Sequence, residues 1–242
     1  DRSRGRTDTI LMLTYGGDGP SVLTSIPRDS IVDIPGYGRT KINAAYAYGG
    51  PPLLVKTLEA ETGVRIGGYT EIGFGGVEQI VDALGGIEIC PAEDIVDKDA
   101  KLNIKEGCQE VDGKTALAYS RSRKAFATGD IARGQHQREV IGAIGSAATT
   151  ASTVLNPVTY SRVLDSTAKS LAVGQDDSMF SFGRFAWKLS RSMAGSGLNC
   201  TVPIADLSVR WDSERALAYF GHLENGTTDE LGELCTDDGL GK

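Results

Sequence analysis

Residues 119–138 read YSRSRKAFATGDIARGQHQR, and this stretch joins two predicted helices. It holds four arginines, a lysine, a histidine and two glutamines, in a chain whose net charge is -7. Asp112 is a suitable cap for a helix that ends near Tyr119, and Asp130 for a longer helix that runs to about Thr150. This local reversal of charge indicates a binding site for an anion between the two helices.

The arginines of this stretch have a spacing that predicts where they point. Arg121 and Arg123 are two residues apart, which puts them on one side of an extended segment but about 200° apart on a helix. We therefore expect them in the strip where the first helix ends. In the second helix, Arg133 and Gln137 head a stripe of aliphatic residues and should face inward, at the mouth of a pocket. Guanidinium groups suit diphosphate oxygens; the alternative is a solvated basic loop.

The length and composition are compatible with one large α/β domain, and two domains are not required. The chain has 242 residues, of which 40% are hydrophobic and 24% charged, enough for a substantial core. No apolar run reaches about eighteen residues, the length that would predict a membrane helix. The acidic balance argues against nucleic acid as a partner, because a nucleic-acid footprint needs a broad basic face.

Apolar runs separated by glycine and proline predict an alternation of strands and helices. The alternation is typical of helices layered on a mixed sheet. Residues 91–111 are polar and are predicted as a loop, and the acidic tail after Glu224 is predicted to be mobile unless Cys235 tethers it. Strands are predicted at 9–15 and 21–27, joined as a hairpin, and at 70–74, 87–90 and 200–204, with a short strand and turn at 31–38. The predicted helices include a short one at 41–46, which Gly49 and Gly50 end, and others at 51–60, 77–84 and 211–223.

Four cysteines leave three possible disulfide pairings. None has the CxxC spacing of zinc or redox sites. Pairing Cys90 with Cys108, and Cys200 with Cys235, would close short loops, each worth a few kcal/mol. Four free buried thiols are the alternative. Disulfides would place the chain outside the cytoplasm.

The sequence lacks the common signatures of hydrolases, zinc proteases and nucleotide-binding loops. GxSxG, HExxH and the Walker lysine motif are all absent, and the two histidines are His136 and His222. A histidine-centred triad is therefore not favoured.

Several separate motifs, in order, resemble those of the LytR-CpsA-Psr family, in particular its actinobacterial type. The similarity runs from about Arg6 to Ile144 and is looser after Thr150. The motifs are RTDTILML, SIPRDS, DIPGYGRTKINAAYAYGG, VDALGGIEI, ALAYSRSR and GDIARGQHQR.

The resemblance implies a three-layer α/β/α sandwich around a central mixed β-sheet, with residues 1–242 as one catalytic domain. It implies a phosphotransferase that moves a glycopolymer from a polyprenyl diphosphate carrier to a cell-wall acceptor and releases polyprenyl phosphate. The acceptor would be the 6-hydroxyl of N-acetylmuramic acid in peptidoglycan, or a surface glycoprotein. Magnesium would be the cofactor, and a pyrophosphatase side activity is compatible with this chemistry.

The family acts at the extracytoplasmic face of the bacterial membrane. We therefore expect the membrane surface as a partner, through the lipid carrier and an N-terminal anchor that this sequence does not contain. Because the family is extracytoplasmic, we also expect the disulfides Cys90–Cys108 and Cys200–Cys235.

The resemblance also assigns roles to individual residues. Asp8 resembles the magnesium-associated aspartate of the family. A second metal aspartate lies on an upstream strand that is missing here, and Asp1 is its candidate. At the start of the second helix the family often reads RQQ, whereas this chain has His136, Gln137 and Arg138. Either the cationic position has moved by two residues to Arg138, or Arg138 points outward. The residues that resemble the diphosphate-binding side chains are Arg28, Lys41, Arg121, Arg123, Arg133 and Gln137.

A second function of a different class would use the same arginines. It is a non-catalytic module that binds an anionic glycolipid or a wall polymer. Turnover of a polyprenyl diphosphate distinguishes the enzyme from the module.

Overall fold

The computed structural model describes residues 7–16, 19–122, 130–173, 187–189 and 197–241, and of residues 130–133 and 168–173 only the backbone. The chain groups into two compact units, Asp1–Tyr69 with Gly195–Lys242 and Thr70–Ala194, called here the first and the second unit. The prediction that residues 1–242 make up one catalytic domain stays a prediction. None of the described helices combines the length and apolar composition needed to span a bilayer.

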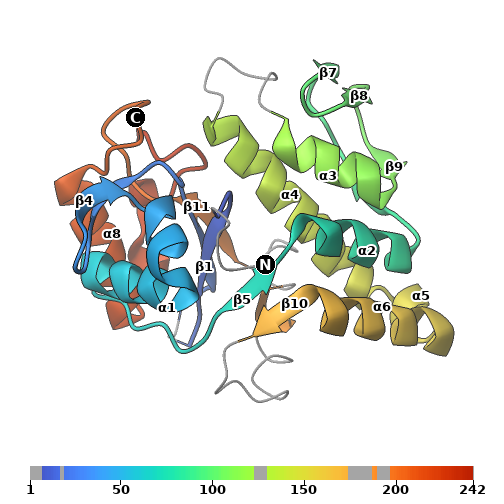
Figure 1. Cartoon of the computed structure of the whole chain (residues 1–242), viewed down its shortest axis with the longest axis horizontal. Helices are drawn as coiled ribbons and strands as arrows, with labels where there is room; N and C mark the ends of the chain where they lie inside the picture. The colour runs from blue at the N-terminus through green and yellow to red at the C-terminus, as the bar shows by residue number, and fades with distance from the viewer. Residues whose placement is uncertain (1–6, 17–18, 123–129, 174–186, 190–196, 242) are drawn as a thin grey trace. The chain divides into compact units, whose positions relative to one another are not determined.

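The first unit is built on a mixed three-stranded sheet in the order β1-β2-β11. β1 (Ile10–Thr14) pairs antiparallel with β2 (Val22–Ile26), and β2 pairs in parallel with β11 (Leu198–Thr201) (Figure 1). All five residues of β2 are buried, as expected for a central strand. The predicted hairpin and the predicted mixed sheet are confirmed.

The β3–β4 ribbon, α1 and α8 complete the first unit. α1 was predicted as two helices, and the structure has one element with non-helical backbone at Gly49 and Gly50, so the predicted break is a kink. α8 is tied to the sheet because the hydroxyls of Tyr219 and Thr24 lie 2.6 Å apart. The bounds are β3 (Ile31–Ile34), β4 (Gly38–Lys41), α1 (Asn43–Thr62), α8 (Ser213–Asn225) and the 3-10 turns η3 (Thr228–Glu230) and η4 (Gly232–Leu234).

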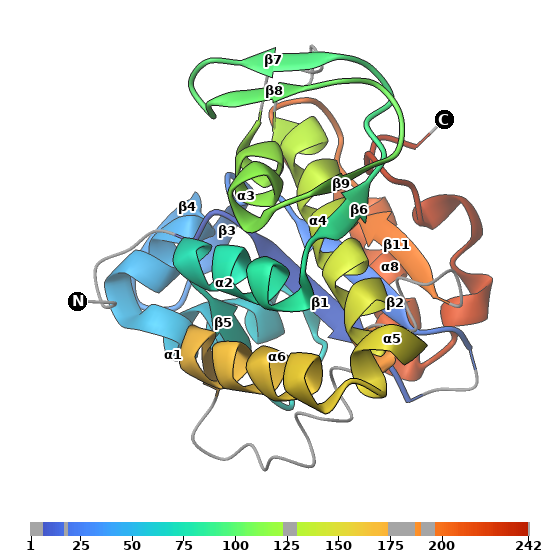
Figure 2. The ribbon, with the colours of Figure 1, turned by 90° about the vertical axis from the view of Figure 1, so that its right-hand side faces the viewer.

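The second unit is mainly helical. α2 packs against α3 and α6, and α3 packs against α4 (Figure 2). Asp112 caps α3 as predicted, since it accepts a hydrogen bond of 2.8 Å from the N–H of Thr115. The helices are α2 (Phe74–Leu84), α3 (Gly113–Arg121), α4 (Asp130–Thr149), α5 (Ala151–Val154) and α6 (Pro157–Ser170), and a β5 (Thr70–Ile72) and β10 (Leu171–Val173) pair lies beside them.

The prediction of a loop over residues 91–111 is wrong. The segment forms β7 (Ile95–Asp97), β8 (Leu102–Ile104) and β9 (Gln109–Val111), and β9 pairs with β6 (Ile87–Ile89). Each strand has only three residues, too few to show the two-residue alternation of a strand in the sequence. Their apolar ends are nevertheless buried in the core of this unit.

Both expected disulfides are present, Cys90–Cys108 and Cys200–Cys235. The second bridge joins the acidic tail to β11. The tail is held further by Arg215, whose guanidinium donates to the carbonyl of Leu240 at 2.9 Å. The acidic tail is therefore tethered through Cys235, which is one of the two alternatives that the sequence allowed.

Removing a bridge should destabilise the protein in proportion to the loop it closes. The bridges span 18 and 35 residues of sequence, so the chain-entropy model predicts losses of about 3 kcal/mol for Cys90→Ser with Cys108→Ser and about 4 kcal/mol for Cys200→Ser with Cys235→Ser. Urea denaturation measures both losses in free energy of unfolding. A double Ser variant as stable as the parent would contradict the structural role of that bridge.

Candidate active site

The β1–β2 hairpin places Asp8 beside Arg28. The strands pair Ile10 with Ile26. Asp8 lies two residues before Ile10 and Arg28 two residues after Ile26, so the same antiparallel register brings them opposite each other. Their side chains form an ion pair and are 33% and 19% exposed. The Nε atom of Arg28 is buried and has no hydrogen-bond partner among the described atoms. A buried donor without a partner is costly, so a ligand oxygen is well placed to satisfy it.

Lys41 lies beside Asp29, the residue that follows Arg28, because β4 returns to the end of β2. The N–H of Asn43 donates to the carbonyl of Arg28 at 3.1 Å. Lys41 is half exposed, and its Nζ lies 3.2 Å from a carboxylate oxygen of Asp29. The first unit thus places the Asp8–Arg28 pair and Lys41, residues predicted from separate motifs, at the same end of β2.

Arg121 is the last residue of α3 in the second unit. It is exposed, and its guanidinium carbon lies 5.3 Å from the ring centroid of Phe74, in a cation–π contact. Ser122 has extended backbone and a fully buried side chain, whose hydroxyl donates to Asp97 at 3.2 Å. The predicted position of Arg121 at a helix end is confirmed. Arg123 and Asp1 lie outside the described residues.

Gln137 faces inward from α4, as predicted. It is 8% exposed and lies one turn before Val140, which is 2% exposed. Arg133 lies in the same helix, and its side chain is outside the described residues. The alternative that Arg138 points outward is wrong, since its side chain is 6% exposed.

Sequence reasoning missed a polar network around Glu139. Its carboxylate accepts a hydrogen bond of 2.6 Å from the hydroxyl of Tyr119 and one of 2.7 Å from the N–H of Cys90. The ring of His136 lies against Tyr119, with centroids 4.2 Å apart. The network joins α3, α4 and the first disulfide, and no spacing in the sequence reveals it because its three parts come from separate segments.

Burial sets the protonation of this network. It raises the pKa of the Tyr119 hydroxyl, and the hydrogen bond to Glu139 adds to the rise. It lowers the pKa of His136, against the opposing effects of Glu139 and of backbone hydrogen bonds with Ser122 and Tyr119. His136 is therefore neutral at pH 7.

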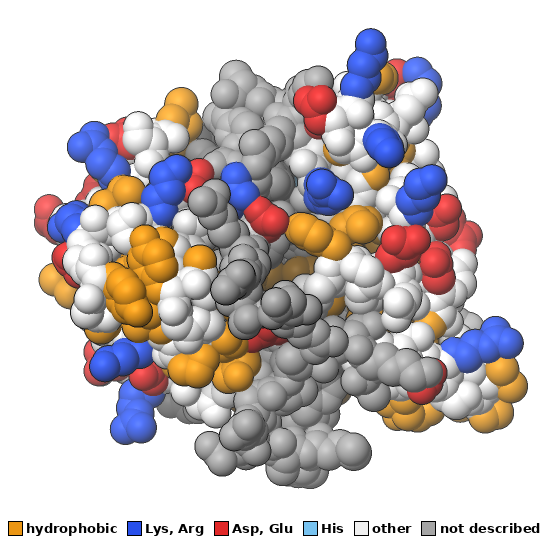
Figure 3. Space-filling model, in the orientation of Figure 1, with side chains coloured by type: hydrophobic (Ala, Val, Ile, Leu, Met, Phe, Trp, Pro, Cys, Tyr) orange, Lys and Arg blue, Asp and Glu red, His pale blue; other side chains and the backbone are white. Residues whose placement is uncertain are grey.

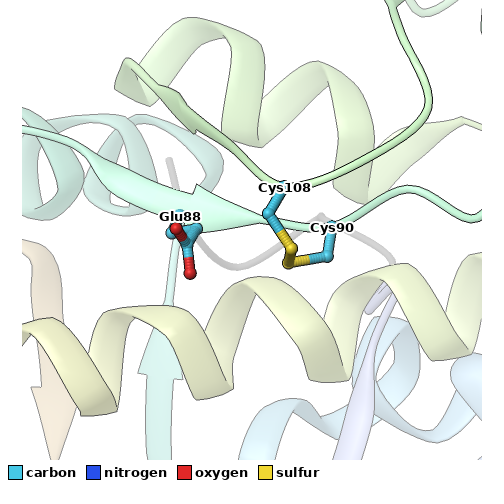
Figure 4. A group of neighbouring side chains, drawn as sticks. All are labelled: Glu88, Cys90 and Cys108. Carbon is cyan, nitrogen blue, oxygen red and sulfur yellow. A yellow bond between two sulfur atoms is a disulfide. The ribbon is translucent and has the colours of Figure 1, made fainter.

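Among the described residues, one group gathers three possible metal-ligand atoms within 4.8 Å of one another: Glu88, Cys90 and Cys108 (Figure 4). Both sulfurs belong to a disulfide, whereas metal ligation needs a thiolate. This group is therefore not a candidate metal centre in the oxidised protein.

The surroundings of Asp8 fit a different kind of metal site. Magnesium is held by one or two carboxylates and completes its shell with phosphate oxygens and water. Asp8 supplies one partly exposed carboxylate. The residues thus fit a magnesium ion held jointly by the protein and a phosphate ligand.

A cavity of about 310 Å³ in the first unit lies away from these residues. It is lined by Thr14 and Tyr15 at the far end of β1 and by Leu223 and Glu224 of α8. Asp8 precedes the other end of β1, so this cavity is no part of the candidate active site.

A model of the LytR_cpsA_psr family matches residues 1–221. The chain belongs to the LytR-CpsA-Psr family. LcpB of Corynebacterium glutamicum, named a probable cell wall biosynthesis protein, is 43% identical over 226 residues, which cover 90% of this chain and 53% of LcpB. A Bacillus cereus TagU, named a polyisoprenyl-teichoic acid–peptidoglycan teichoic acid transferase, is 31% identical over 216 residues, covering 88% and 66% of the two chains. The chain thus spans about half the length of LcpB.

Solved structures of LytR-CpsA-Psr proteins share the fold. The LytR-Csp2A-Psr enzyme from Actinomyces oris aligns with a TM-score of 0.77 at 22% identity, covering 92% of this chain and 89% of the other. TagT bound to LI-WTA aligns with a TM-score of 0.72 at 24% identity, covering 93% and 87%. The predicted α/β fold class with a mixed sheet is confirmed.

His136 should make stability depend on pH. A histidine in an unfolded chain has a pKa of about 6.5. Because the pKa of folded His136 is lower, its contribution is fully present above about pH 6.5 and is lost as the pH falls toward the folded-state pKa. His136→Phe, which retains a ring against Tyr119, should flatten the fall in free energy of unfolding between about pH 7 and pH 5. Urea denaturation at several pH values measures this, and an unchanged slope would contradict it.

Proposed function

We propose that this protein transfers a glycopolymer from a polyprenyl diphosphate carrier to a cell-wall acceptor and releases polyprenyl phosphate. The observation that carries the proposal is the cluster of Asp8, Arg28 and Lys41 in a LytR-CpsA-Psr chain. Two cations, one of which has a buried Nε donor without a partner, suit the oxygens of a diphosphate. The name of TagU supports the same substrate class, and the name of LcpB, a probable cell wall biosynthesis protein, supports a role in the same process.

The chemistry is a displacement at phosphorus. An acceptor hydroxyl attacks the phosphorus next to the sugar, a new O–P bond forms, and the P–O–P bridge to the prenyl side breaks. The hydroxyl proton passes to a carboxylate, for which Asp8 is the candidate, and polyprenyl phosphate leaves with the electrons of the broken bond. Arg28, Lys41, Arg121, Arg123, Arg133 and Gln137 are the proposed diphosphate ligands that stabilise the growing charge.

Magnesium, held by Asp8 and by Asp1 as a second candidate, is the proposed cofactor and would neutralise phosphate charge. The proposed acceptor is the 6-hydroxyl of N-acetylmuramic acid in peptidoglycan, or a surface glycoprotein. Water in place of the acceptor would give pyrophosphatase activity. Two disulfides support a location at the extracytoplasmic face of the membrane.

Transfer should depend on the shape of the Arg121 side chain as well as on its charge. Arg121 is exposed and rests on Phe74, so Arg121→Ala should leave the melting temperature within a few degrees of the parent. Loss of a charge-stabilising donor should reduce the rate about a hundredfold. Arg121→Lys should rescue poorly, because an ammonium group lacks the bidentate geometry.

The measurement is release of polyprenyl phosphate from a glycosylated polyprenyl diphosphate with peptidoglycan fragments as acceptor. Arg162→Ala is the matched control, since Arg162 is an exposed arginine of α6. Tight binding of the lipid by the parent with no turnover would contradict the enzyme and favour a binding module. Full activity of Arg121→Lys would contradict the diphosphate role of Arg121.

Transfer should also require magnesium through Asp8. A diphosphate beside a carboxylate is repelled unless a cation lies between them, and the charge on the leaving phosphate grows in the transition state. Chelation should therefore lower the rate of the parent more than its affinity for lipid. Asp8→Ala should have a low rate that added magnesium restores poorly, whereas Asp206→Ala, at a partly exposed carboxylate paired with Arg210, should behave as the parent. A parent rate that chelator leaves unchanged would overturn the role of the metal.

A further inference from the structure

Two tyrosines stack on the surface of the first unit. Tyr37 and Tyr48 are 57% and 51% exposed, and their ring centroids lie 4.7 Å apart at an angle of 19° between planes. Figure 3 shows hydrophobic side chains gathered on the face of the first unit that carries α1. Contiguous exposed apolar surface is a common mark of a binding site.

The backbone holds both rings in place. The N–H of Tyr37 donates to the carbonyl of Ile34 at 2.9 Å, across a turn with Pro35 and then Gly36, whose φ is 85°. Proline followed by a left-handed glycine is the sequence of a type II turn, which sets the position of the next residue. Tyr48 comes from α1, just before its kink. The pair is therefore preorganised, and binding would cost little side-chain freedom.

The ribbon that carries Tyr37 also leads to the proposed diphosphate site. β3 and β4 pair Ile34 with Gly38 at the turn and Ile31 with Lys41 at the other end. Tyr37 directly precedes Gly38, and the three steps from Gly38 to Lys41 span about 10 Å of strand. A short oligosaccharide attached to a diphosphate at Lys41 is long enough to reach the tyrosines.

The face between these points is polar and open. Arg39 and Lys41 are two residues apart on β4, so they share one face of the ribbon, and both are exposed. Arg39 lies 3.7 Å from the carboxylate of Asp33 across the ribbon. This ion pair offers donors and acceptors to sugar hydroxyls along the path from Lys41 to the turn.

We propose that Tyr37 and Tyr48 form a glycan subsite, which binds pyranose rings of the carrier-linked glycopolymer near its diphosphate. This inference rests on the proposed function and names the part of the protein that recognises the sugar. The C–H face of a pyranose stacks on an aromatic ring, and a tyrosine hydroxyl hydrogen-bonds at its edge. The subsite therefore contributes affinity for the sugar portion and none for the lipid diphosphate.

Two ligands separate these contributions: farnesyl diphosphate, and farnesyl diphosphate that carries di-N-acetylchitobiose. Isothermal titration of the parent should show tighter binding of the glycosylated ligand. Tyr37→Ala and Tyr48→Ala should each weaken binding of the glycosylated ligand about tenfold, as for a contact residue that dominates its site, and change binding of farnesyl diphosphate by less than about twofold. Tyr48→Phe keeps the ring and should retain most of the affinity.

The control variant is Tyr160→Ala, which removes an exposed tyrosine of α6 in the second unit. Melting temperatures establish that each variant is folded. In the transfer assay the two Ala variants should raise KM for a glycosylated donor while kcat stays near the parent value. A role confined to packing the ribbon on α1 would not discriminate between the two ligands.

The outcomes separate two failures. If the parent binds neither diphosphate, the proposed function is wrong, and the glycan subsite, which rests on it, is wrong as well. If the parent binds both ligands equally, or if the Ala variants weaken both to the same extent, the diphosphate site stands and the glycan subsite is wrong. Selective loss of the glycosylated ligand supports the subsite.

Discussion

The antiparallel register of β1 and β2 determines the chemistry of the first unit. Pairing Ile10 with Ile26 places Asp8 opposite Arg28 just beyond the ladder. The side-chain period of a strand is two, so a shift of one residue would put the two side chains on opposite faces of the sheet. The register is strongly specified, because every residue of β2 is buried and such a shift would also displace the core.

In the second unit, the carboxylate of Glu139 links the end of α3 to a neighbouring segment. One carboxylate links Tyr119, two residues before Arg121, to the backbone at Cys90. On the other side of the helix end, Asp97 accepts from the buried hydroxyl of Ser122. Because these bonds flank Arg121, the unit can hold the backbone below this arginine rigid while the guanidinium itself stays exposed. Such an arrangement supports positioning of a charged ligand.

The disulfides stabilise segments that have little core of their own. Cys90–Cys108 closes the segment that carries β7 and β8, whose strands have three residues each. Cys200–Cys235 anchors a tail rich in glycine and acid to β11. The apolar ends of the short strands are buried in the core of their unit, and each cross-link adds to stability by restricting the unfolded chain.

The sequence by itself determined the α/β class, the β1–β2 hairpin, the capped helix α3 and the family. These features depend on local chemistry, such as the Asp112 cap, or on motifs that lie together in the chain. The sequence also selected Asp8, Arg28 and Lys41, through their motifs. Tertiary structure alone decided that these residues lie at one end of β2, because strand register and the return of β4 join separate segments of the chain.

Tertiary structure also decided the burial of Arg138, the Glu139 network and the stacking of Tyr37 on Tyr48. Tertiary structure also decided the three short strands β7, β8 and β9, since three residues are too few to show a periodic pattern in the sequence. In each case the deciding contact is made by residues from separate elements. Composition and spacing describe one segment at a time, so such contacts exist only once the chain has folded.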